Sequence, residues 1–160
     1  MTMAKLDVNL EKLYDRDYLK WIETTVEKLR LRDYSNIDWE NMIEAIEDMG
    51  RTERRSLESN LVVVIMHLLK WQFQPDKRSG SWKGTIAEHR RRIRKSFQDS
   101  PSLQPYLERV FSECYSDVIE QASAETGFAI ETFPLCVYTS AEVLDSNFWP
   151  DLLSDGMTEN

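Results

Sequence analysis

The stretch "LVVVIMHLLKW", residues 61–71, constrains the fold of this chain more than any other segment. It is apolar on almost every side of a helix, whereas a surface helix has one apolar and one polar face. It is also far shorter than the roughly 20 apolar residues that a membrane-spanning helix needs. We therefore expect a helix from about Thr52 to just before Pro75, enclosed by the rest of the protein.

The segments before this stretch show the three- and four-residue spacing of amphipathic helices. One helix is expected from Asp17 to about Arg32. A second is expected to begin after Asp38, which can cap it, and to end at Gly50, a residue type that favours a helix stop. Its predicted apolar face consists of Trp39, Met42, Ile43, Ile46 and Met49.

The segments after the stretch are also helical in pattern. A fourth helix is expected over about 82–99, and a fifth from a cap at Ser100 or Ser102 to Gly127. The sequence "TSAE", residues 139–142, resembles a capping box for one short helix. No convincing pair of strands appears, so the pattern predicts an all-α fold.

The length and composition indicate how this fold is organised. The chain has 160 residues, of which 41% are hydrophobic and 30% are charged, and this profile is typical of one soluble globular domain. We expect a single-domain bundle of about five main helices over residues 14–150, with a short irregular C-terminal segment and flexible ends at 1–13 and 151–160. The two cysteines and the absence of an apolar leader favour a reducing, cytoplasmic location.

Charge is distributed unevenly along the chain. Residues 70–95 hold nine basic against two acidic residues, although the whole chain has a net charge of -8. One interpretation is a nucleic-acid-binding surface. The other, which we favour because the chain is acidic overall, is that acids of the fifth helix (Glu113, Asp117 and Glu120) face the basic residues within the molecule or across a dimer. The candidate anion-binding residues are Lys77, Arg78, Lys83, Arg91, Arg94 and Lys95.

A second candidate site is a polar cluster. Three glutamates, Glu40, Glu44 and Glu47, follow one edge of the second predicted helix, and carboxylates with a histidine such as His67 could hold a metal for hydrolysis. A solvated, ion-paired edge is the commoner outcome for such a pattern. The histidines have no partner at a motif spacing, and the chain has no nucleotide-binding motif, so we expect no metal and no cofactor. The candidate cluster is Glu40, Glu44, Glu47, His67 and Lys70.

Five sequence blocks in order resemble the bacterial, largely cyanobacterial family of uncharacterised proteins known as domain of unknown function 29. The resemblance implies an all-helical fold and covers roughly residues 14–150, but it supplies no activity and no site residue. It also suggests that the polar cluster lies where the second, third and fourth helices meet. The blocks are "DWENMIEAIEDMG" (38–50), "ERRSLESNL" (53–61), "HLLKWQFQP" (67–75), "SWKGTIAEHRRRI" (81–93) and "DSPSLQPYL" (99–107).

These observations favour a protein-interaction module over an enzyme. We expect a protein partner or a homo-oligomer and no membrane. Nucleic-acid binding by the basic segment 77–95 and a metal-dependent hydrolase with a carboxylate and histidine site remain as alternatives. The feature that would decide among them is an exposed apolar patch.

Overall fold

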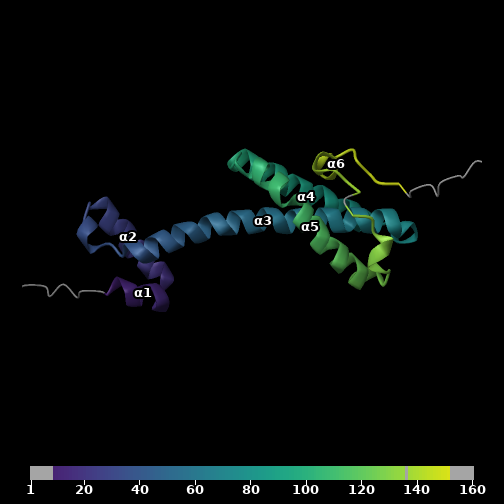
Figure 1. Cartoon of the computed structure of the whole chain (residues 1–160). Coiled ribbons are helices and arrows are strands. Elements are labelled where there is room, and N and C mark those ends of the chain that lie inside the picture. Colours follow the sequence, from purple (N-terminus) through teal and green to yellow (C-terminus); the bar gives the residue numbers. More distant parts are fainter. Residues whose placement is uncertain (1–8, 136, 152–160) are drawn as a thin grey trace, which may run out of the picture. The chain divides into compact units, whose positions relative to one another are not determined.

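All regular secondary structure is helical in the computed structural model, which describes residues 9–135 and 137–151. The predicted all-α fold is confirmed. Short 3-10 turns connect or follow the longer helices at Tyr34–Asn36, Pro75–Lys77 and Ile130–Thr132. The α-helices are α1 (Leu10–Arg16), α2 (Tyr18–Arg30), α3 (Trp39–Phe73), α4 (Gly80–Asp99), α5 (Leu103–Thr126) and α6 (Ser140–Leu144) (Figure 1).

Helix α3 differs most from the prediction. The predicted stop at Gly50 is wrong, because the second and third predicted helices form one continuous helix of 35 residues. A single interior glycine costs only about 1 kcal/mol relative to alanine, and no proline follows it before Pro75. Ion pairs from Arg51 back to Glu47 and Asp48 also link the turns on either side of Gly50.

Other predicted helix ends are confirmed by their caps. The side chains of Asp38 and Thr139 accept hydrogen bonds from the first turns of α3 and α6, and Gly127 ends α5 at φ 75°. That left-handed conformation favours glycine. At the start of α5, Ser102 occupies the cap position but its side chain makes no capping hydrogen bond.

Helix α1 was not predicted from the sequence. Its cap is Asn9, whose side chain accepts a hydrogen bond from the backbone N–H of Lys12. With α2 and the start of α3, it forms a small apolar cluster centred on Leu10, Trp21 and Ala45. The expected flexible ends at 1–13 and 151–160 lie outside the described residues except for residues 9–13 and Asp151.

The chain divides into two compact units, Met1–Thr52 and Glu53–Asn160. The second unit has the main core, in which Leu61, Val64 and Ile65 of α3 are fully buried. The prediction that the apolar stretch is enclosed is therefore confirmed. Residues of α4, α5 and the segment around α6 complete this core, including Ile86, Ile93, Leu107, Val118 and Val143. The predicted single domain over 14–150 stays a prediction.

Candidate functional site

Arg90 is the most deeply buried member of the basic segment, with only 2% of its surface exposed. Its Nε donates to the carbonyl of Val143 at 2.7 Å, and its Nη2 lies 3.1 Å from the carbonyl of Phe148 and 3.5 Å from that of Glu142. Burial lowers the pKa of this guanidinium. Arg90 therefore holds the segment after α5 onto α4 by hydrogen bonds to backbone carbonyls.

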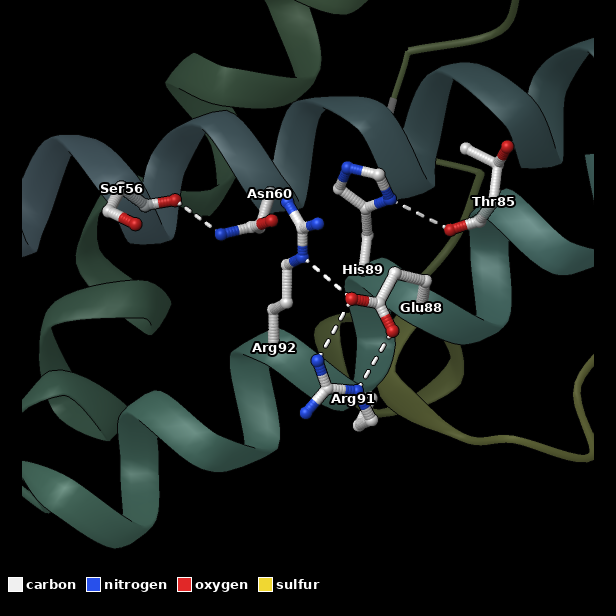
Figure 2. Close-up of polar contacts among 7 residues, drawn as sticks. All are labelled: Ser56, Asn60, Thr85, Glu88, His89, Arg91 and Arg92. Carbon is white, nitrogen blue, oxygen red and sulfur yellow. Dashed lines mark hydrogen bonds and ion pairs between the residues drawn. The ribbon is translucent and has the colours of Figure 1, made fainter.

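Two neighbouring arginines form ion pairs with an acidic residue of their own helix. Arg91 and Arg92 lie three and four residues after Glu88, so their side chains reach its carboxylate at 2.8–2.9 Å (Figure 2). These hydrogen bonds lower the pKa of Glu88 to about 2. The pairing is exposed, so it contributes little stability, but it neutralises part of the basic surface.

Aromatic rings order the basic loop between α3 and α4. The guanidinium of Arg78 donates to the carbonyl of Trp71 at 2.7 Å and lies 4.9 Å from the centre of its ring. The ammonium of Lys83 lies 5.4 Å from the centre of the Trp71 ring and 5.9 Å from the centre of the Trp149 ring. Cations over aromatic faces are favourable, so Arg78 of the loop and Lys83 of the first turn of α4 both have internal partners.

Within the single chain, the three named acids of α5 do not pair with the basic segment, and pairing across a dimer stays a prediction. Lys95 pairs with Asp99 at 2.7 Å and Arg94 contacts Ser146 at 3.3 Å, while Lys77 is exposed. Within the described part of the chain, Glu113, Asp117 and Glu120 are exposed and form no ion pair with these residues. The partners of residues 70–95 are mainly acids of α4, aromatic rings and backbone carbonyls, together with Glu125 of α5, which pairs with Lys70.

The polar-cluster candidates on the second half of α3 lie near α4 and α5. Lys70 pairs with Glu125 at 3.2 Å and lies 5.3 Å from the centre of the Trp82 ring. His67 is half-buried and its Nδ1 donates to the carbonyl of Val63, as that of His89 does to Thr85. Burial is the main cause that lowers the pKa of His67, so the neutral form is favoured.

The three glutamates belong to the first unit, whereas His67 and Lys70 belong to the second. Glu40, Glu44 and Glu47 are exposed residues of the first unit, and Glu47 pairs with Arg51 at 3.7 Å. In residues 9–135 and 137–151, no group of three or more histidine, cysteine, aspartate or glutamate side chains is placed to hold a metal.

The apolar face predicted for residues 39–49 is largely exposed. We call Trp39, Met42, Ile43, Ile46 and Met49 the apolar stripe. Ile46 is 58% and Met49 is 67% exposed, although their spacing is that of core residues. Nine of the twelve large hydrophobic side chains exposed in the described residues belong to the first unit, so the exposure is concentrated there.

A groove of about 370 Å³ lies between α2 and the first part of α3, within the first unit. In the described residues, Nε1 of Trp21 and Oγ1 of Thr25 are buried there without a hydrogen-bond partner. A buried polar atom without a hydrogen-bond partner is costly, so these two atoms lower the stability of the first unit. The walls of this α2–α3 groove are Tyr18, Trp21, Ile22, Thr25, Val26, Leu29, Met42, Ala45, Ile46 and Met49.

Sequence reasoning missed the groove and Arg90 for different reasons. The apolar stripe was visible, but its spacing alone does not show whether another helix covers it. Arg90 looked like its neighbours Arg91 and Arg92. The usable signal was its spacing, because it lies four residues after Ile86 and three before Ile93, on the inward side of α4.

Comparisons with known proteins identify the family without supplying an activity. In the described part of the chain, no helix combines the length and the apolar character needed to cross a membrane. No curated protein and no solved structure matches. A family model described as "Domain of unknown function DUF29" matches residues 13–149, which is most of the sequence. The chain therefore belongs to the DUF29 family.

Proposed function

We propose that this protein is a helical protein-interaction module that acts by docking rather than by catalysis. The observation that carries the proposal is the apolar stripe, which is largely exposed and shares Met42, Ile46 and Met49 with the walls of the α2–α3 groove. Large contiguous apolar surfaces on folded proteins commonly mark interaction sites. A cytoplasmic location, as predicted from the sequence, belongs to the same proposal.

The local structure of the stripe supports docking. The indole N–H of Trp39 donates to the carbonyl of Tyr34 at 3.2 Å, while 46% of this residue is exposed. The ring is thus an ordered aromatic surface at the edge of the stripe. Preorganised aromatic side chains are frequent anchors of protein interfaces, because little conformational entropy is lost when they are covered.

Nucleic-acid binding by residues 77–95 is the weaker alternative. Arg90 is buried, Arg91 and Arg92 bind Glu88, and Arg78 binds Trp71. Phosphates would have to compete with these internal partners. The contacts therefore favour a structural role for much of the basic segment.

Site-specific photo-crosslinking in the cells of origin tests the proposal. A photo-reactive amino acid replaces Ile43, which lies on the stripe but outside the lining of the groove. We expect covalent adducts with protein after illumination. Such adducts would show that the stripe is in contact with a protein.

The matched control places the same photo-reactive residue at Leu135 in the second unit, where 81% of the side chain is exposed. No adduct is expected there. Equal adducts at both positions would indicate non-specific contact, and no adduct at position 43 would refute docking at the stripe.

A further inference from the structure

We propose that the occupant of the α2–α3 groove is a second copy of this chain, which packs its own α2 and its own stripe against those of the first. This inference rests on the proposed function and names its partner. The two helix pairs would form a four-helix bundle with two-fold symmetry.

The apolar face of each helix is too wide for a simple helix pair. At about 100° per residue, the apolar positions of α3 from Ala45 round to Ile43 cover about 160° of the helix surface. Those of α2 from Trp21 round to Leu19 cover about the same arc. A two-helix seam uses a narrower face, whereas a helix in a four-helix bundle packs against two neighbours and needs the wider one. Each helix therefore has an apolar half-face for a further helix.

The two helices also match each other in length. Helix α2 has 13 residues, and residues 39–52 of α3 provide a similar length, so each spans about 20 Å. An occupant that covers both half-faces has to present two helices of this length. A second copy presents such a pair, and two-fold packing would place each half-face against the complementary helix of the partner.

The exposed area is sufficient for a stable dimer. Seven large hydrophobic side chains on α2 and the first part of α3 are between 39% and 67% exposed. At roughly 100 Å² each, their burial would remove roughly 700 Å² per copy from water, close to the roughly 800 Å² per partner of a standard interface. These side chains are Tyr18, Leu19, Val26, Trp39, Ile43, Ile46 and Met49.

Charged residues lie beside the stripe and not within it. The glutamates of α3 follow one edge, beyond Ile43, and Lys20 pairs with Glu23 on α2 at 3.8 Å. The centre of the proposed interface would thus hold no charge, as in the cores of known interfaces. The glutamate edge that resembled a metal site would then be the polar rim of a dimer.

The size of the first unit gives a reason for association. Its buried hydrophobic residues in the described part of the chain are Leu10, Trp21, Ile37 and Ala45. A unit of this size buries too little apolar surface to be very stable by itself, and oligomerisation is a common remedy. A second copy is available wherever the chain is made.

Light scattering after size exclusion, over a series of concentrations, tests the inference. The wild-type chain should have twice the 18.9 kDa mass and should dissociate on dilution. Ile46→Asp should raise the dissociation constant at least about a hundredfold, because two carboxylates would be buried in an apolar interface. Leu135→Asp is the matched control and should leave the mass unchanged.

Two further measurements keep the result interpretable. Far-UV circular dichroism should show that Ile46→Asp keeps its helices, because position 46 is exposed in the single chain. Illumination of mixed, differently tagged copies bearing the photo-reactive residue at position 43 should give an adduct that carries both tags. A dimer that persists in Ile46→Asp, or a wild-type monomer at every concentration, would overturn the inference.

The crosslinking separates this inference from the proposed function. Adducts at position 43 that contain only other proteins would refute the second copy and leave docking intact. No adduct of any kind would count against both.

Discussion

The two halves of α3 have similar apolar residues but very different surroundings. In the second half, Leu61, Val64 and Ile65 have no exposed surface, because α4, α5 and the segment around α6 surround them. In the first half, Ile46 and Met49 are more than half exposed. Apolar spacing therefore identifies a face that needs a partner, whereas the remainder of the fold decides whether the chain itself supplies that partner.

The largest effect expected from this comparison is in the core. Leu61→Ala should lower the free energy of unfolding by about 2–5 kcal/mol, because it leaves a cavity where neighbouring helices cannot close in. Ile46→Ala should cost less than about 0.5 kcal/mol at concentrations where the chain is a monomer. Urea denaturation followed by circular dichroism measures both. Similar losses for the two variants would mean that the halves of α3 are equally buried.

The sequence alone predicted the buried half of α3 and several helix ends, but not the continuity of α3. The enclosed half was predictable because "LVVVIMHLL" has no polar face to turn towards water. The Gly127 and Thr139 helix ends were predictable because their chemistry is local. The continuity of α3 through Gly50 was not, because a glycine weakens a helix by an amount that flanking turns can outweigh.

The candidate sites were less predictable than the fold. Lys77, Arg78 and Arg91 stand out as a basic run, but their partners depend on distant segments or on side-chain direction, which a count of charges does not include. Arg78 binds a carbonyl of α3, and Arg90 binds carbonyls more than fifty residues away. The exposure of the apolar stripe could not be predicted, because it depends on whether other helices pack against the stripe, and the spacing of the apolar residues does not show this.

The next largest effect is expected at Arg90, whose buried hydrogen bonds hold the segment around α6 against α4. Arg90→Met should lower the free energy of unfolding by about 2–4 kcal/mol, because it removes a charged donor from three backbone carbonyls. The segment containing α6 should then become more accessible to protease. Limited proteolysis and urea denaturation measure these effects.

Arg91→Met is the control for Arg90→Met. Its side chain is exposed and, among the described residues, its ion pair is with Glu88, so its loss should change stability by less than about 1 kcal/mol. An equal effect of the two substitutions would show that charge, and not the buried hydrogen bonds, explains the role of Arg90. Another interaction would then have to hold the segment around α6 against α4.

The smallest effect is expected at Gly50, where the predicted helix end and the observed continuous helix make opposite predictions. Gly50→Ala should stabilise the chain by about 0.5–1 kcal/mol, because alanine has the higher helix propensity. Among the described residues, Gly127 is the one glycine with positive φ, so Gly127→Ala should destabilise by a similar amount. Thermal unfolding of both variants measures the difference in sign. Destabilisation by Gly50→Ala would indicate a break in α3, and the two halves would then be separate helices with separate partners.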